Sequence, residues 1–171
     1  MPVGIIFIVE SVHQHMKWIV IAPHPDDEVI GCHTMLSARD VIEVWYVWWD
    51  TDRQKEALKC SDLFLFRPVF LSGVEGLLER LKTIDVSIVG LVLPSPGDDH
   101  YQHKQAYYIV SACLPMVRIR VYSTGMKEWF VRKASDSTGK RCALDCCYPS
   151  QASLWKYDYR YFMFEGMVEL T

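Results

Sequence analysis

Two short segments of the chain gather the residue types that hold metal ions and move protons. The first is residues 24–28 (HPDDE), where an imidazole and three carboxylates follow an apolar run. The two prolines at 23 and 25 restrict the local backbone, so a stiff turn displays these side chains. A purely structural alternative exists, because acidic residues at the start of a helix complement the positive end of its dipole.

The second segment is residues 98–103 (DDHYQH), which follows another long apolar run. His100 and His103 are three positions apart, and residues at this spacing share one face of a helix. Both imidazoles can therefore point into the same crevice. A lone histidine is usually structural, but two on one helix face after a buried strand indicate a site.

The two segments together supply the donors of a catalytic metal centre. A carboxylate and two imidazoles from neighbouring strand ends make a site of three protein ligands with an open position, which is the usual arrangement of catalytic zinc. Two histidines and one carboxylate also suit ferrous iron. The sequence therefore predicts one bound metal, Zn²⁺, with Fe²⁺ as the alternative.

Apolar runs alternate with helix-like segments along the chain, and this alternation predicts the fold. Strands are expected at residues 18–22, 41–49, 68–71, 85–93, 118–123, 129–132 and 159–168. Helices are expected at residues 28–38, 53–64, 74–81, 100–114 and 139–147. The pattern predicts an α/β doubly wound, mostly parallel sheet with helices on both faces, a Rossmann-like architecture. Such sheets bind ligands beyond the carboxyl ends of their strands, where the strand order reverses.

Length and composition limit the function classes. The chain has 171 residues, is 50% apolar and carries a formal net charge of -3, which predicts a single domain over residues 1–171. The negative balance argues against binding to a nucleic-acid backbone. Six cysteines without a CxxC pair favour free thiols in a reducing cytosol. The apolar run at residues 3–9 is too short to span a membrane and has the wrong flank for a signal peptide, so we expect a cytoplasmic protein.

Further pieces complete a resemblance to a known family. Residues 53–56 (RxxE), 100–103 (HxxH) and 148–151 (YPSQ, with Lys140 and Ala143 before it) follow HPDDE in this order. The set resembles the LmbE-like or PIG-L-like zinc-dependent N-deacetylases, which remove acetyl groups from N-acetylglucosaminyl and related amides. The resemblance implies an LmbE-like fold and hydrolysis of a small, N-acetylglucosamine-like substrate to acetate and an amine.

The resemblance also implies residue roles. His24, Asp27 and His103 would be the metal ligands. Asp26 would be the general base, and His100 would assist the oxyanion or the leaving amine. This division is chemically sensible, because a metal polarises the amide carbonyl while an unligated carboxylate beside it accepts a proton from water.

The role implied for Arg53 is contact with the substrate; the alternative is an ordinary helix residue paired with a nearby acid. The competing function is a catalytically silent relative that binds a metal or a sugar without turnover. The complete motif set argues against this alternative, because a silent relative has no chemical need of Asp26. A nucleotide-binding module is disfavoured because the chain has no GxGxxG or P-loop motif.

The sequence departs from the family's pattern in ways that concern the site. Gln102 stands where an acid is common, and His33 stands where small residues are usual. The segments 49–53 and 94–100 are shorter than the loops that typically cover the substrate. Short loops wall only part of a crevice, so we expect a homo-oligomer in which a neighbouring subunit supplies the missing wall. The alternative is a shallow, open site that serves a large substrate.

Overall fold

Strands and helices alternate in the computed structural model, which describes residues 16–124, 131–156, 158 and 160–170. The strands are β1 (Lys17–Ala22), β2 (Val41–Tyr46), β3 (Arg67–Phe70), β4 (Val89–Pro94), β5 (Ile119–Ser123), β6 (Val131–Lys133) and β7 (Phe164–Leu170). The helices are α1 (Asp27–Ser37), α2 (Thr51–Phe64), α3 (Gly73–Leu81), α4 (Tyr101–Cys113), α5 (Ser137–Cys147), the 3₁₀ turn η1 (Pro149–Gln151), α6 (Ala152–Lys156) and α7 (Arg160–Met163).

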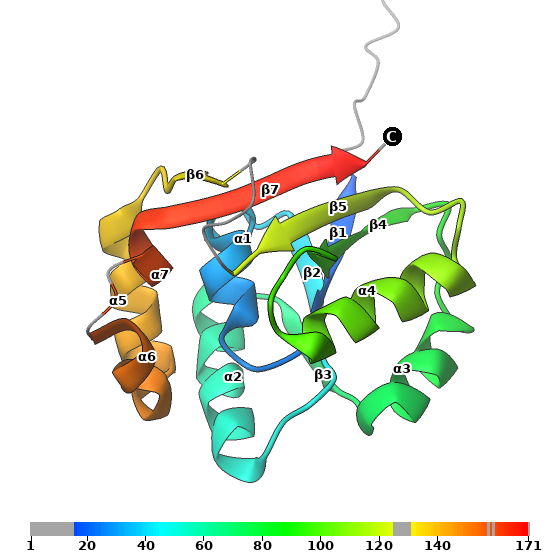
Figure 1. Ribbon diagram of the computed structural model, residues 1–171. Helices are drawn as coiled ribbons and strands as arrows, with labels where there is room; N and C mark the ends of the chain where they lie inside the picture. The colour runs from blue at the N-terminus through cyan, green and yellow to red at the C-terminus, as the bar shows by residue number, and fades with distance from the viewer. Residues whose placement is uncertain (1–15, 125–130, 157, 159, 171) are drawn as a thin grey trace, which may run out of the picture.

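The strands form one sheet in the order β3-β2-β1-β4-β5-β7-β6 (Figure 1). The strands from β3 to β5 are parallel, whereas β7 runs antiparallel to both β5 and β6. The predicted doubly wound, mostly parallel α/β fold is therefore confirmed. The strand order reverses between β1 and β4, which is where this architecture binds its ligands.

Helices cover both faces of the sheet, as the strand β1 shows most clearly. Its side chains alternate between the faces, because successive residues of a strand point in opposite directions. Trp18, Val20 and Ala22 pack in a core with residues of α1, α2 and α5. Ile19 and Ile21 pack in a second core with residues of α3 and α4. Burial on both faces explains why this strand reads as a continuous apolar run.

Two predicted strands were too long. The strand expected at residues 85–93 begins only at Val89, because Asp85 forms a local turn in which its side chain accepts hydrogen bonds from the backbone N and the hydroxyl of Ser87. The strand expected at residues 41–49 ends at Tyr46. Beyond it the backbone N–H of Trp48 donates to the carbonyl of Pro23, in the loop that carries the HPDDE segment.

The strand predicted at residues 159–168 was wrong in its first half. Residues Arg160–Met163 form the short helix α7, and the strand begins at Phe164. The carboxylate of Asp158 accepts a hydrogen bond from the backbone N of Arg160 at 3.1 Å, an interaction typical of a helix start. The strand predicted at 129–132 lies partly outside the described residues, and β6 covers its described end.

The helix α1 is interrupted beside the sheet. Cys32 has a non-helical backbone, with φ at -131°. Lys140 on α5 is fully buried, and its ammonium donates to the carbonyl oxygens of Ile30 and Phe164. The backbone N of Thr34 donates to the Glu165 carboxylate at 3.0 Å. Side chains from α5 and β7 thus bond to backbone groups on both sides of the break.

The buried Lys140 predicts a specific pH dependence of stability. Burial lowers the pKa of Lys140 to about 8, although Glu165 opposes the shift. A lysine in an unfolded chain titrates near pH ~10.4. Between these values the unfolded chain binds more protons at this residue, so the free energy of unfolding should increase with pH, by up to about 3 kcal/mol in total.

Urea unfolding at roughly pH 7.5 and roughly pH 10 measures this effect. Other groups titrate over the same range, so the comparison is between the parent and the Lys140→Met variant. The parent should gain more stability, or lose less, than the variant as the pH rises. The same pH dependence in both proteins would contradict the assignment.

The described part of the chain contains no helix that is both long and apolar enough to cross a membrane. All six cysteines are free thiols, and Cys32, Cys60 and Cys147 are buried.

Candidate active site

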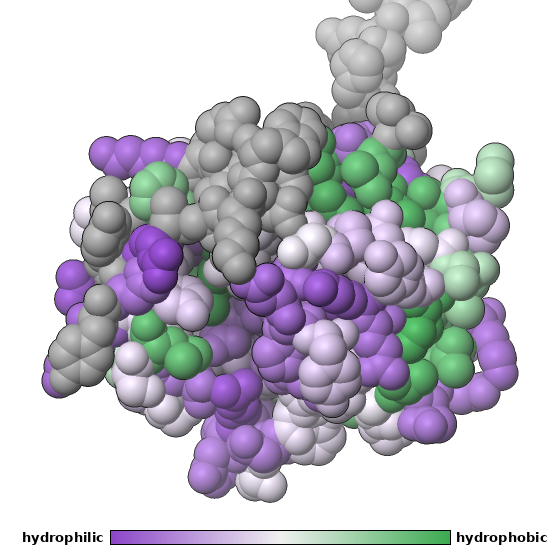
Figure 2. Space-filling view, viewed as in Figure 1, coloured by the Kyte–Doolittle hydropathy of each residue, from purple (hydrophilic) through white to green (hydrophobic). Residues whose placement is uncertain are grey.

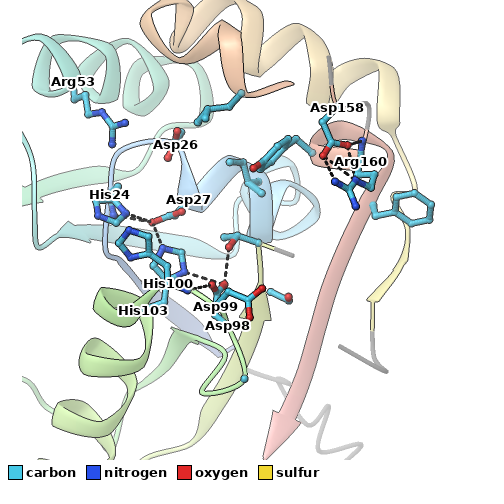
Figure 3. Close-up of a pocket in the computed structure, with 17 residues that line it drawn as sticks. His24, Asp26, Asp27, Arg53, Asp98, Asp99, His100, His103, Asp158 and Arg160 are labelled. Atoms are coloured by element: carbon cyan, nitrogen blue, oxygen red, sulfur yellow. Dashed lines mark hydrogen bonds and ion pairs between the residues drawn. The ribbon is translucent and has the colours of Figure 1, made fainter. Parts of the chain in front are cut away.

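The two segments expected to supply the metal ligands, residues 24–28 and 98–103, lie close together where the strand order reverses. HPDDE leaves β1 and enters α1, and the segment at 98–103 leaves β4 and enters α4. The rings of His24, His100 and His103 lie together, with centroids 4.9 to 5.5 Å apart (Figure 3). One nitrogen from each of these rings falls within 4.8 Å of the others.

Asp27 lies against two of these imidazoles. Its Oδ2 atom is 3.4 Å from Nδ1 of His24 and 3.2 Å from Nε2 of His103. The same oxygen accepts a hydrogen bond from the backbone N of His24 at 2.8 Å. Imidazole nitrogens and a carboxylate oxygen are the donors that zinc and ferrous iron accept, so this cluster fits a divalent metal. His100 is close enough to be a further donor.

The charges of the cluster are strongly coupled. Burial alone would raise the pKa of Asp27. The charge interactions and hydrogen bonds of this carboxyl with His103 and His24 have the larger effect and hold its pKa far below the usual value. Burial also opposes protonation of His103, yet Asp27 and Asp98 raise its pKa to about 10. The site is therefore a carboxylate facing an imidazolium. A divalent cation that bound to this nitrogen would have to displace the Nε2 proton, because a ligating imidazole is neutral.

Asp26 occupies a tightly held turn next to the cluster. Its φ is 113°, which is rare for a residue with a side chain. Its backbone N donates to the carboxylate of the buried Glu28 at 3.1 Å, and Glu28 also accepts a hydrogen bond from the Tyr148 hydroxyl. Burial and the neighbouring Asp27 raise the pKa of Asp26 well above its usual value, although Arg53 opposes the shift. A carboxylate with a raised pKa is suited to accept a proton.

The RxxE segment (residues 53–56) and the Ser150-Gln151 pair contact each other, although each is a weak motif alone. The guanidinium of Arg53 donates to the side-chain oxygen of Gln151. The buried Glu56 accepts hydrogen bonds from the backbone N of Ser150 at 2.8 Å and from its hydroxyl at 2.6 Å. These bonds connect α2 to η1 and hold Arg53 at the pocket, where the Gln151 amide is its hydrogen-bond acceptor.

His100 differs from the other two imidazoles because it is exposed. Partial loss of hydration around the ring, together with the neighbouring His24 and His103, nevertheless lowers the pKa of His100 below its usual value. This shift favours the neutral form of the imidazole. Hydrophilic side chains gather over the start of α4, on the face seen in Figure 2.

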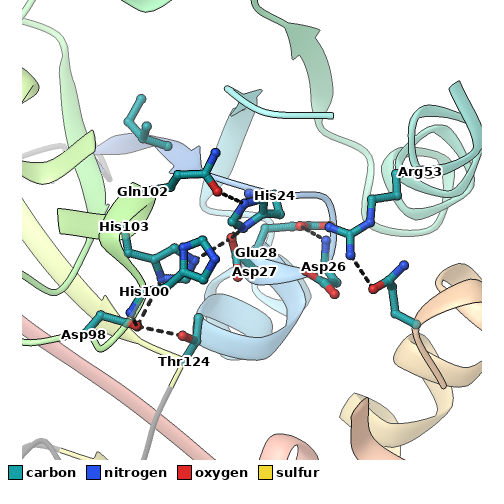
Figure 4. Close-up of polar contacts among 12 residues, drawn as sticks. His24, Asp26, Asp27, Glu28, Arg53, Asp98, His100, Gln102, His103 and Thr124 are labelled. Atoms are coloured by element: carbon teal, nitrogen blue, oxygen red, sulfur yellow. Dashed lines mark hydrogen bonds and ion pairs between the residues drawn. The ribbon is translucent and has the colours of Figure 1, made fainter. Parts of the chain in front are cut away.

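Three polar contacts around the imidazoles were not predicted. The Asp98 carboxylate accepts from Nδ1 of His103 at 3.0 Å and from the Thr124 hydroxyl at 2.7 Å (Figure 4). The Gln102 side-chain oxygen lies 2.8 Å from Nε2 of His24. Asp98 lies in the segment 98–103, whose residue types indicate a metal site, but its spacing from His103 does not predict a contact between the two side chains. Thr124 follows β5 and belongs to no motif.

A pocket of about 700 Å³ opens beside these groups, within the size range of small-molecule sites. Asp158 and Arg160 lie across the pocket from the imidazoles (Figure 3). Leu154, Tyr161 and Phe164 complete this wall. The chain's own C-terminal elements thus form part of a wall for which the sequence had suggested a neighbouring subunit.

Comparison with known proteins places the fold but not the family. No family model and no curated protein matches the sequence. The structure is similar to the conserved protein TT1542 from Thermus thermophilus, with a TM-score of 0.62, 16% identity, and coverage of 90% of this chain and 94% of that one. It is also similar to a deacetylase of teicoplanin biosynthesis, solved as a complex with teicoplanin, with a TM-score of 0.56, 13% identity and coverage of 84% and 90%. The chain therefore shares its α/β fold with a deacetylase.

Proposed function

We propose that the protein is a zinc-dependent hydrolase that removes an N-acetyl group from a small, N-acetylglucosamine-like substrate. The observation that carries this proposal is the convergence of His24, Asp27 and His103 in one pocket, beside the buried carboxylate of Asp26. The motif resemblance to LmbE-like and PIG-L-like deacetylases and the fold shared with a deacetylase support the same function.

The proposed reaction assigns separate roles to these groups. His24, Asp27 and His103 hold the ion, which when bound supplies the Lewis acidity that polarises an amide carbonyl and activates water. Asp26 accepts a proton from the attacking water. The oxygen of this water bonds to the carbonyl carbon, the C–N bond breaks as the departing nitrogen receives the proton that the water gave to Asp26, and the products are acetate and an amine.

His100 and Arg53 act on the two sides of the reacting amide. The lowered pKa of His100 favours its neutral form, so this imidazole stabilises the oxyanion as a hydrogen-bond donor, or it takes up a proton during the reaction and passes it on to the amine. Arg53, held by Gln151, directs its remaining donors to oxygen atoms of the substrate. The pocket extends beyond these groups to the Asp158 and Arg160 wall, which leaves room for the rest of a sugar-like molecule.

The wider predictions made from the sequence remain part of this proposed function. The chain acts as one domain, and we expect a cytoplasmic homo-oligomer. Sedimentation at the concentrations used for the assay tests the oligomer. A fully active monomer would show that activity does not require a neighbouring subunit to complete the pocket.

Acetate release from a panel of amides tests the function. The zinc-loaded chain is incubated with N-acetylglucosamine, its 1-phosphate, an N-acetylglucosaminyl glycoside and an N-acetyl amino acid, and acetate and free amine are measured. We expect equal amounts of both products from at least one sugar amide. Bound zinc without acetate from any sugar amide would favour the silent relative.

A further inference from the structure

His103 is held on both of its ring nitrogens. Nε2 lies 3.2 Å from Oδ2 of Asp27, on the side of the proposed metal. Nδ1 lies 3.0 Å from Oδ2 of Asp98, on the opposite side of the ring. The side chains of His103 and Asp98 are only 4% and 8% exposed, so water competes little for this contact.

The Asp98 carboxylate is itself fixed from two directions. Its Oδ2 accepts a hydrogen bond from the Thr124 hydroxyl at 2.7 Å, beyond the end of β5. Its Oδ1 accepts one from the backbone N of His100 at 2.9 Å, at the start of α4. An ionised carboxylate has no proton to donate and can only accept hydrogen bonds. The proton between Asp98 and His103 therefore belongs on Nδ1 of His103.

We propose that Asp98 is the positioning residue of the metal centre, which fixes the Nδ1–H form of His103 so that Nε2 presents its lone pair to the metal. The inference rests on the proposed function only in requiring a divalent ion at this site. A carboxylate on the outer nitrogen of a ligating histidine orients the ring and raises the basicity of the inner nitrogen.

The other imidazole proposed as a ligand, the partly buried His24, offers an internal comparison. Nε2 of His24 lies 2.8 Å from the Gln102 amide oxygen, so His24 faces Asp27 with its opposite nitrogen, Nδ1. An amide fixes a tautomer as a carboxylate does, but it carries no charge to increase the basicity of the ring. Loss of Asp98 should therefore weaken metal binding more than loss of Gln102.

Competition for zinc with a chromophoric chelator measures this difference. Asp98→Asn should lower the zinc affinity by roughly 10- to 100-fold, the usual effect of losing an outer-shell partner. Gln102→Ala should have a smaller effect. Asp99→Asn is the matched control, because it removes the same charge from the adjacent residue without touching the Nδ1 contact. Equal effects of Asp98→Asn and Asp99→Asn would overturn the proposal.

A second measurement needs no variant and so does not depend on the folding of Asp98→Asn. Long-range ¹H–¹⁵N spectra of the zinc-loaded parent, with labelled histidine, report which nitrogen of His103 carries its proton. We expect the proton on Nδ1, and a proton on Nε2 would overturn the proposal.

These readouts separate this inference from the proposed function. Zinc binding that depends on Asp98, in a chain that releases no acetate, would refute the function and leave the inference intact. Acetate release by the parent, together with unchanged zinc affinity in Asp98→Asn, would refute the inference and leave the proposed function intact.

Discussion

Asp26→Asn should keep its metal and lose acetate-releasing activity by about 10²- to 10⁴-fold, the range that a positioned base contributes. Asparagine has nearly the same shape and can occupy the same turn, but its amide does not accept a proton from water. The raised pKa of Asp26 and its place beside Asp27 make it the group best suited to this transfer. Zinc content and kcat/KM, measured on the same preparation, test the prediction.

The control for this variant is Asp62→Asn, which removes an exposed carboxylate from α2. It should change neither zinc content nor turnover. If Asp26→Asn loses zinc together with activity, Asp26 is a ligand rather than a base. If turnover is retained, Asp26 has no part in the proton transfer.

His103→Ala should lower the zinc affinity by more than the roughly 10- to 100-fold expected for loss of an outer-shell partner, because it removes one of the proposed ligands. It also leaves two buried carboxylates, Asp27 and Asp98, without their shared imidazole. Removing one partner of a buried charged pair typically costs about 3–5 kcal/mol, so the metal-free variant should be destabilised by a comparable amount. Chelator competition and urea unfolding provide the two measurements.

His100→Ala is the informative comparison, because His100 belongs to the cluster of three imidazoles but not to the ligand set implied by the motifs. We expect this variant to retain zinc. Equal loss of zinc in His100→Ala and His103→Ala would make the three imidazoles the ligand set, and tight binding by His103→Ala would remove His103 from the centre.

The fold was predictable where burial leaves a simple trace in the sequence. Strands such as β1 are covered on both faces and read as continuous apolar runs. The same reasoning failed at residues 85–88, where Val86 and Ile88 extend the apolar pattern into a turn made by Asp85. It failed again at α7, because aromatic residues typical of strands conceal a helix that begins beside Asp158.

The site was predictable to the extent that topology brings distant segments together. Parallel strands place their carboxyl ends at one edge, which predicts that His24 and His103 approach each other. The partners of these residues depend on the direction of individual side chains. Nothing in the spacing predicts that Asp98 contacts His103 or that Gln151 contacts Arg53. The pocket wall formed by α6, α7 and β7 could not be predicted either. These elements are short, or the sequence pattern assigned them to the wrong type of secondary structure.

Zinc titration into the metal-stripped chain, with acetate release as the readout, tests the central claim most directly. The substrate is whichever N-acetyl sugar the zinc-loaded chain cleaves in the panel. We expect no release before zinc is added and a linear increase that saturates at one zinc ion per chain. Undiminished release from the stripped chain, or saturation only at two or more ions per chain, would contradict a single metal centre built on His24, Asp27 and His103.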